Sequence, residues 1–258
     1  MPPPVYLLPR LQTLAQKVRQ ARGLALLCDF DGTLVGFRLR PRSVSLNPSV
    51  RAAIRRLVRH PGVQFWIVTG RKIADVRRHV RVRGVRYAGL HGWETDHRQA
   101  SRRAKQAARA LLEPFLENIS AALAPRRGIR IEDKGVTIGV HYRGARPSSV
   151  GMAWRTLQAA LRSSGKGLRV IRGCRVWEVV PPQVKGKGTA VRSILATVHG
   201  RPLVIYIGDD TTDESAFFSL PKAITVKVGK GRPTRARFFL RNPREVAALL
   251  STVARTLP

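Results

Sequence analysis

Apolar residues recur along the chain in two patterns, short continuous runs and helical repeats, and the two alternate. Each continuous run has the length of a strand and few polar positions, as expected for strands buried on both faces of a parallel sheet. The runs span residues 24–28, 63–68, 203–208 and 223–228, with a shorter one near 85–89. Between them, apolar positions at helical spacing predict helices over residues 11–22, 48–60, 187–197, 214–218 and 243–254. This alternation favours right-handed crossovers and an α/β fold with a doubly wound parallel sheet.

The pattern changes in the middle of the chain. A long amphipathic helix is expected first, and two alternating strands follow, joined by a turn at Asp133-Lys134-Gly135. A second helix and a second strand pair, divided at Gly173, complete the region. These four elements are predicted at residues 101–124, 130–140, 149–161 and 168–180. We therefore expect a core domain of residues 1–96 and 183–258, with residues 97–182 as an inserted, smaller α/β cap domain.

Acidic or hydroxyl residues follow three of the predicted strands. Asp29 and Asp31 follow the first, Thr69 the second and Asp209 the third. Open α/β sheets place their chemistry at the carboxyl ends of the strands. Two carboxylates at positions i and i+2 repel each other and are costly to bury, so a cation is expected between them. The alternatives are a strained turn or a chance strand end for the aspartates and a helix cap for Thr69.

The composition is strongly basic. The 258 residues include 48 lysines and arginines but only 15 acidic residues, which gives a formal net charge of +33. Such a charge attracts polyanions, so a basic nucleic-acid-binding protein on the same scaffold is an alternative of another class. However, the arginines lie in helices, as at Arg51, Arg55, Arg56 and Arg59, and in residues 38–42, with no single basic tail. We expect a solvated basic surface with nonspecific attraction for polyanions and some steering of an anionic substrate.

The sequence also indicates where the protein works. Its two cysteines, Cys28 and Cys174, form no disulfide framework, which is typical of a reducing compartment. No run of eighteen apolar residues is present, and the first residues lack a basic-then-apolar signal pattern. We expect a cytoplasmic protein without a membrane partner, and the oligomeric state is left open.

Two acidic motifs resemble those of a known enzyme family. Asp29-Phe30-Asp31-Gly32-Thr33-Leu34 and Gly208-Asp209-Asp210-Thr211-Thr212-Asp213-Glu214 are similar to motifs of the haloacid-dehalogenase superfamily, and in particular of trehalose-6-phosphate phosphatases. The resemblance implies that Asp29 is the nucleophile and Asp31 the general acid and base. Thr69 would donate a hydrogen bond to the phosphoryl group, and Lys187 would neutralise its charge. Lys185, which is also followed by a glycine, is the alternative lysine.

The same resemblance implies a bound Mg²⁺ ion. Mg²⁺ prefers octahedral oxygen coordination and keeps several water ligands. The implied ligands are Asp29, the backbone carbonyl of Asp31, and Asp209. Either Asp213 or Asp210 would contribute directly or through water.

The resemblance extends to residues that would bind a sugar phosphate. Gly89-Leu90-His91-Gly92-Trp93-Glu94 resembles a motif of the same phosphatases, and so do short motifs in the predicted cap domain. The implied substrate contacts are Gly70, Arg71, His91, Gly92, Glu132, Lys134, Arg143 and Glu178. For His91 a structural role is the alternative, and the charged strand residues have the alternative of pairing across a hairpin.

Taken together, the resemblance implies a Mg²⁺-dependent hydrolase that converts trehalose 6-phosphate to trehalose and inorganic phosphate through an aspartyl-phosphate intermediate, the last step of trehalose biosynthesis. Sucrose 6-phosphate and a glycosyl phosphoglycerate are the alternative substrates.

Overall fold

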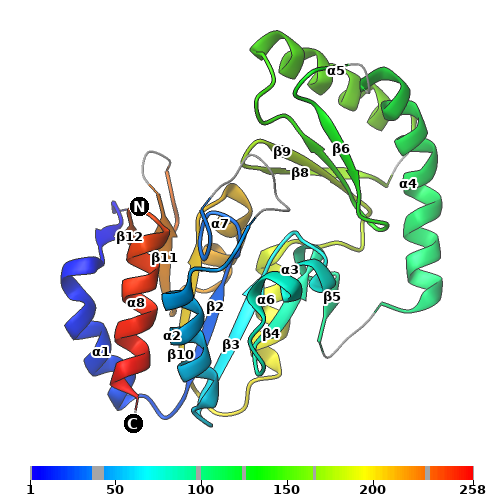
Figure 1. Cartoon of the computed structure of the whole chain (residues 1–258). Helices are drawn as coiled ribbons and strands as arrows, with labels where there is room; N and C mark the ends of the chain where they lie inside the picture. The colour runs from blue at the N-terminus through cyan, green and yellow to red at the C-terminus, as the bar shows by residue number, and fades with distance from the viewer. Residues whose placement is uncertain are drawn as a thin grey trace. The chain divides into compact units, whose positions relative to one another are not determined.

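The computed structural model describes residues 2–36, 44–96, 100–123, 126–164, 167–229 and 233–257. The arginine-rich residues 38–42 lie outside this part of the chain. The chain divides into two compact units (Figure 1). Unit 1 comprises Met1–His97 and Gly186–Pro258, and unit 2 comprises Arg98–Lys185.

Unit 1 is built on a sheet in which eight strands are described. Their order is β1 (Val5–Tyr6), β12 (Phe238–Leu240), β11 (Ile224–Val228), β10 (Leu203–Gly208), β2 (Leu24–Cys28), β3 (Val63–Val68), β4 (Arg86–Gly89) and β5 (Glu94–Thr95). Neighbouring strands pair in parallel except β4 and β5, which pair antiparallel. From β2, strands β3, β4 and β5 extend the sheet to one side, and β10, β11, β12 and β1 extend it to the other. The carboxyl end of β2 therefore lies where the strand order reverses, the usual position of a ligand site in such sheets.

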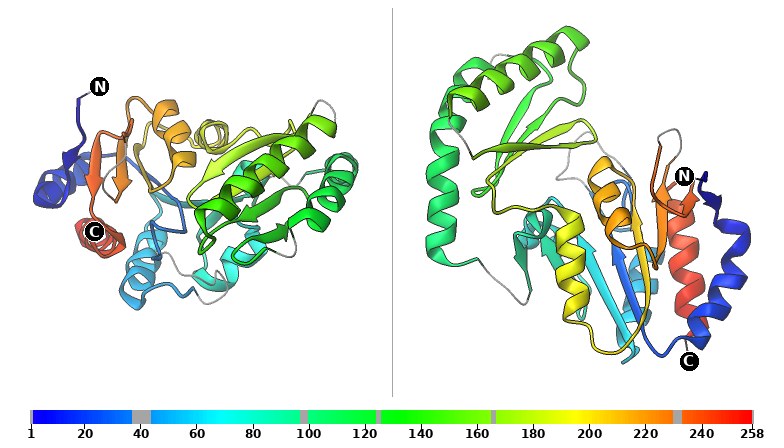
Figure 2. Two further views of the ribbon diagram at one scale, coloured as in Figure 1. Left: turned by 90° about the horizontal axis from the view of Figure 1, so that it is seen from above. Right: turned by 180° about the vertical axis from the view of Figure 1, so that it is seen from behind.

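Helices cover both faces of this sheet (Figure 2). One face packs against α1 (Leu11–Gln20), α2 (Pro48–Arg59), α3 (Ile73–Val80) and α8 (Pro243–Thr256). The other packs against α6 (Lys187–Ala196) and α7 (Thr211–Ser219). Every residue of β2 is consequently buried, which explains why this strand is a continuous apolar run. The doubly wound α/β fold predicted from the sequence is confirmed.

Unit 2 is an antiparallel sheet with two helices on one face. The strand order is β6 (Arg130–Asp133), β7 (Ile138–His141), β9 (Val176–Val180) and β8 (Arg169–Gly173). Apolar residues from one face of the sheet pack against α4 (Arg102–Leu123) and α5 (Pro147–Ser163). Residues that alternate with these along the strands belong to the other face, where the charged positions of β6 and β9 lie.

Short elements differ from the sequence-based expectation. Strands β1, β5 and β12 have two or three residues each, too few for a hydrophobic period to be recognised. Helix α7 begins at Thr211, three residues before the expected start. The reason is the capping box: the Asp210 side chain accepts from the first-turn backbone, and the Asp213 side chain accepts from the N-cap backbone. The acidic motif therefore includes the helix start.

Within the described residues, no helix combines the length and the apolar character that crossing a membrane would require.

The packing of unit 2 predicts a position-dependent loss of stability along α4. Phe115 is 1% exposed, whereas Leu111, one turn earlier, is 37% exposed. Phe115→Ala is expected to lower the free energy of unfolding by about 3–5 kcal/mol, because it leaves a cavity. Leu111→Ala, the control on the same helix, is expected to cost less than about 1 kcal/mol. Urea unfolding followed by circular dichroism measures both, and equal losses would contradict the packing described.

Candidate active site

The chain turns sharply at the end of β2 and buries one carboxylate there. Asp29 is 5% exposed, and its backbone N–H donates to the carbonyl of Ile207 on β10. Beyond it, Leu34 N–H bonds back to Phe30 and Gly32 N–H bonds to Val35. Gly32 has a φ of 84°, in the left-handed region that glycine adopts at little cost. The glycine of the motif thus belongs to the turn over residues 30–35, directly after Asp31.

Lys187 connects Asp29 with a second buried carboxylate. Its Nζ lies 2.8 Å from Oδ1 of Asp29 and 2.8 Å from Oδ1 of Asp213. Lys187 is 2% exposed at the first position of α6, and Asp213 is fully buried. Lys185, the alternative lysine, is exposed and belongs to unit 2. Between the two candidates, the structure places Lys187 beside the carboxylates.

Burial and neighbouring charges shift the pKa values of these groups. Burial raises the pKa of Asp29 to about 7, although Lys187 opposes the shift. Burial also raises the pKa of Asp209 well above its usual value, with Asp29 and Asp213 acting in the same direction. For Lys187, burial alone lowers the pKa, but Asp213 and Asp29 outweigh it and the net pKa is raised. Three carboxylates, those of Asp29, Asp209 and Asp213, lie near Lys187. A further positive charge would therefore stabilise the cluster.

Three carboxylates lie close enough to share a metal ion. Asp29, Asp209 and Asp213 each offer an oxygen, and these oxygens lie within 4.8 Å of one another. Hard oxygen donors of this kind suit Mg²⁺. The set therefore fits a divalent cation in its chemistry and in its excess of negative charge. Asp209 also accepts a hydrogen bond of 3.3 Å from Thr33, a residue of the turn after β2.

The other acidic residues of the second motif have defined structural contacts. Both oxygens of Asp213 are hydrogen-bonded: Oδ1 to Lys187 and Tyr206, and Oδ2 to the backbone N–H groups of residues 209 and 210. The side chain of Asp210 caps α7 through a 2.7 Å bond from Thr211 N–H. Asp210 is absent from the group of three carboxylates found among the described residues.

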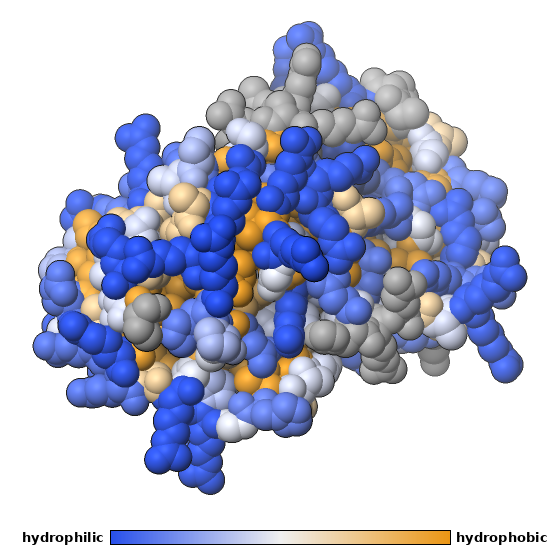
Figure 3. Space-filling view, turned by 60° about the horizontal axis from the view of Figure 1, so that its bottom comes forward, coloured by the Kyte–Doolittle hydropathy of each residue, from blue (hydrophilic) through white to orange (hydrophobic). Residues whose placement is uncertain are grey.

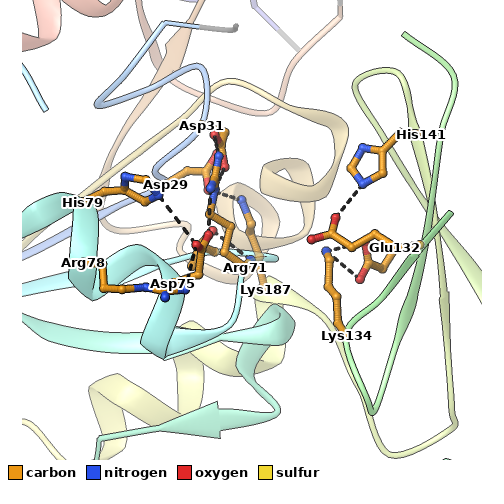
Figure 4. A network of polar contacts seen from close by, with 12 residues as sticks. Asp29, Asp31, Arg71, Asp75, Arg78, His79, Glu132, Lys134, His141 and Lys187 are labelled. Carbon is orange, nitrogen blue, oxygen red and sulfur yellow. Dashed lines mark hydrogen bonds and ion pairs between the residues drawn. The ribbon is translucent and has the colours of Figure 1, made fainter. Parts of the chain in front are cut away.

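Asp31 is held by an arginine (Figure 4). Arg71 donates to both carboxylate oxygens of Asp31, from Nε at 2.6 Å and from one terminal nitrogen at 2.7 Å. Its other terminal nitrogen lies 2.8 Å from Asp75 on α3. Asp75 in turn lies 3.5 Å from Arg78 and 3.6 Å from His79. Arg71, expected from the sequence as a substrate contact, is thus a partner of the expected acid and base.

The remaining expected residues of unit 1 lie at the ends of β3 and β4. Thr69 is 1% exposed, and its hydroxyl accepts from Arg71 N–H at 3.1 Å. It does not cap α3: the N-cap is Lys72, and Glu94 accepts from the first helical N–H at 2.7 Å. His91 is buried against Gly70, where a Cβ would come within 2.8 Å of its Nε2.

The turn at His91 has an unusual backbone. Leu90 and His91 have φ angles of 48° and 56°, and Gly92 follows with 90°. Left-handed conformations at two successive non-glycine residues cost energy and occur frequently at functional sites. A Cβ at Gly92 would lie 2.4 Å from that of Ala190, so α6 packs directly on this turn.

In unit 2, three of the four expected residues form one polar cluster. Lys134 Nζ lies 2.9 Å from each oxygen of Glu178, and Thr137 donates to Glu178 at 2.6 Å. Glu132 lies on β6, which β7 separates from β9, and it forms a hydrogen bond with His141 at 2.7 Å. Arg143 follows β7 and is partly buried.

Sequence reasoning missed several residues in these clusters, among them Tyr206, Lys227 and Asp75. Tyr206 lies within an apolar strand and donates to Asp213 at 2.7 Å, and burial raises its pKa well above the usual value. Lys227 is 6% exposed on β11, and its amine contacts the backbone carbonyl of Asp209. Asp75 lies on α3, outside the sequence motifs named above. The lysine within an otherwise apolar strand was the one available signal, because a buried lysine requires a partner.

The chain is similar to known proteins over most of its length. The model of the Trehalose-phosphatase family matches residues 27–244. A trehalose-phosphate phosphatase of Mycobacterium ulcerans is 34% identical over 248 residues, which is 90% of this chain and 62% of that protein. A homologue of the same name in Mycobacterium bovis is 33% identical and is covered to 63%. The chain thus spans less than two thirds of the length of these curated relatives.

Solved structures agree on the fold. The C-terminal domain of a Candida albicans trehalose-6-phosphate phosphatase has a TM-score of 0.85 at 23% identity, with 98% of both chains covered. At this identity the likeness shows the fold alone. Because the family model matches more than four fifths of the sequence, the chain belongs to the trehalose-phosphatase family.

Proposed function

We propose that this chain is a Mg²⁺-dependent phosphatase that hydrolyses trehalose 6-phosphate to trehalose and inorganic phosphate. The main supporting observation is the contact of Lys187 with Asp29 at the sheet position where the strand order reverses, with Asp209 beside it. Membership of the family supports the choice of substrate, since the relatives are named trehalose-phosphate phosphatases.

In the first step Asp29 attacks phosphorus. Lys187 contacts Oδ1, so Oδ2 is the oxygen that forms the new bond to phosphorus. The bond between phosphorus and the sugar oxygen breaks, and the leaving oxygen takes a proton from the carboxyl group of Asp31. Lys187 and the Thr69 hydroxyl stabilise the charge on the phosphoryl oxygens.

In the second step water hydrolyses the aspartyl-phosphate. Asp31 accepts a proton from the water as its oxygen attacks phosphorus, and the bond from phosphorus to Asp29 breaks. Phosphate leaves and the carboxylate of Asp29 is restored. The bidentate contact with Arg71 holds the Asp31 side chain in one orientation for both proton transfers.

Asp29 and Asp209, with the backbone carbonyl of Asp31, are the proposed Mg²⁺ ligands. When bound, the ion offsets the negative charge of the phosphoryl group and of the carboxylates. Asp213 acts behind them, because its oxygens already hold Lys187, Tyr206 and the backbone at the start of α7. Asp210 has its role at the same helix start.

Sugar recognition is assigned to the polar residues of the second unit and to the turn at the end of β4. Glu132, Lys134 and Glu178 offer acceptors and donors in fixed positions, and Arg143 follows on the same chain segment. Gly70, His91 and Gly92 are the proposed contacts from the first unit. A site built for hydroxyl groups rejects substrates that leave its polar groups unpaired.

We propose that the protein is cytoplasmic, as expected from the sequence. Cys28 and Cys174 are both free thiols, which suits a reducing compartment. On the face shown in Figure 3, hydrophilic side chains are spread over most of the surface. The charge is therefore assigned to solubility and to attraction of the anionic substrate.

A panel of sugar phosphates tests the proposed function. With Mg²⁺ present, trehalose 6-phosphate is expected to release phosphate with a kcat/KM at least about a hundredfold above sucrose 6-phosphate and glucose 6-phosphate, since unmatched polar groups are penalised strongly. Asp29→Asn is expected to abolish release, and Glu117→Gln, an exposed carboxylate variant on α4, to retain it. A preference for another sugar phosphate, or activity of Asp29→Asn, would refute the proposal.

Metal removal is expected to stop turnover reversibly. Treatment with EDTA should abolish phosphate release, and added Mg²⁺ should restore it. Asp209→Asn is expected to raise the Mg²⁺ concentration for half-maximal activity by at least about tenfold, because a charged ligand is lost. Asp210→Asn should change it far less, since this side chain caps a helix. Equal effects of the two variants would contradict the ligand assignment.

Arg71 provides a test of its role beside Asp31. If it acts through Asp31, Arg71→Met lowers kcat by about tenfold to a hundredfold with little change in KM, because the acid and base is no longer held. A direct substrate contact predicts a raised KM instead. Steady-state kinetics distinguish the two, with Arg55→Met on the exposed face of α2 as the control.

A further inference from the structure

Three residues form a row across the polar face of the four-stranded sheet. Gly139 on β7 pairs with Glu132 on β6 and with Glu178 on β9. The two outer positions have carboxylates, and the middle position has no side chain. The opposite face of these strands is the apolar one that packs on α4 and α5. The row is therefore available for polar chemistry, with a gap at its centre.

The space above Gly139 is occupied by a side chain that reaches from β7 to β6. A Cβ built at Gly139 would lie 3.1 Å from Nε2 of His141, 3.4 Å from Glu178 and 3.7 Å from Glu132. His141 is two residues beyond Gly139 and reaches over it to Glu132, at 2.7 Å (Figure 4). Because the partner is a carboxylate, Nε2 is the donor. A side chain at position 139 would clash with the His141 ring and disturb its hydrogen bond with Glu132.

The two carboxylates of the row are held differently. Glu178 is 4% exposed and is bonded to both Lys134 and Thr137 within its own unit. The Glu132 side chain is 39% exposed, so it reaches the surface of the sheet, and His141 is its hydrogen-bonded partner. That hydrogen bond is the largest cause of a lowered pKa of Glu132, to about 2, and Lys134 and Arg130 act in the same direction.

We propose that His141 and Gly139 are positioning residues for Glu132: His141 fixes the carboxylate in one orientation, and Gly139 leaves the space that His141 needs. The inference rests on the proposed function and concerns its sugar-binding part. A carboxylate held in place accepts hydrogen bonds from neighbouring sugar hydroxyls without first losing rotamer freedom. His141 and Gly139 thus determine how strongly the protein recognises a polyhydroxylated leaving group, and they take no part in the phosphoryl chemistry.

Kinetics with two substrates test this role. For His141→Ala the KM for trehalose 6-phosphate is expected to rise about tenfold or more, the usual effect of losing a hydrogen bond to a charged group. Its kcat/KM for para-nitrophenyl phosphate, which has no sugar, should change less than about twofold. His141→Gln keeps a donor near the position of Nε2 and should restore most of the affinity. His199→Ala, at an exposed histidine of unit 1, is the control.

Gly139→Val tests the space above the strand. The added methyl groups would displace His141, so the same rise in KM for the sugar phosphate is expected, with para-nitrophenyl phosphate again little affected. Gly151→Ala on α5 is the matched control, because a Cβ there meets nothing closer than 3.7 Å. Thermal unfolding of each variant separates loss of folding from loss of recognition. An unchanged KM in folded His141→Ala and Gly139→Val would overturn the proposal.

A titration of Glu132 keeps the inference separate from the proposed function. Carbon-detected NMR of the wild type should show the Glu132 carboxylate still ionised at pH 3.5. In His141→Ala its midpoint should rise toward about 4.3, the ordinary value. Unchanged titration would show that His141 does not hold Glu132, whatever substrate is turned over. Conversely, a shifted titration in a protein that releases no phosphate from trehalose 6-phosphate would refute the proposed function alone.

Discussion

The ion pair between Lys187 and Asp29 is the interaction on which the rest of unit 1 depends. Taking a carboxylate out of water costs several kcal/mol unless it is paired, and here Asp213 and Asp209 add further negative charge. One lysine cannot neutralise three carboxylates. Burial raises the pKa of Asp29 and Asp209, with the neighbouring carboxylates acting in the same direction, and the excess of negative charge makes the cluster a cation site. A stable fold and a reactive site therefore have the same requirement, positive charge at the carboxyl end of β2.

Around this cluster, short-range backbone geometry decides which atoms meet. Gly32 closes the turn after Asp29, Asp210 and Asp213 form the start of α7, and Glu94 accepts from the start of α3. Many polar residues of the motifs therefore bond to the backbone as well as providing chemistry. Arg71 links this scaffold to the reaction, because it joins Asp31 to Asp75 on α3.

Unit 2 uses a different principle, the alternation of side chains along a strand. Apolar residues of β7 and β9 face α4 and α5, and the residues between them place Glu132, His141 and Glu178 on the other face. Gly139 lies between the two glutamates on this face and leaves space there because it has no side chain. An absent side chain in one row of the sheet thus becomes as important as the charged residues beside it.

The sequence by itself determined the fold class and the candidate acidic residues, because buried parallel strands are continuous apolar runs and their ends are marked by Asp29, Thr69 and Asp209. It could not determine partners that come from distant segments. Tyr206 and Lys227 are members of apolar strands, and nothing local indicates that they contact Asp213 and the backbone of Asp209. Likewise, only the strand register placed Gly139 between two carboxylates, and only the pairing of β3 with β2 brought Arg71, which follows β3, to Asp31, which follows β2. Local pattern specifies elements and their ends, whereas hydrogen-bond partners depend on which elements become neighbours in space.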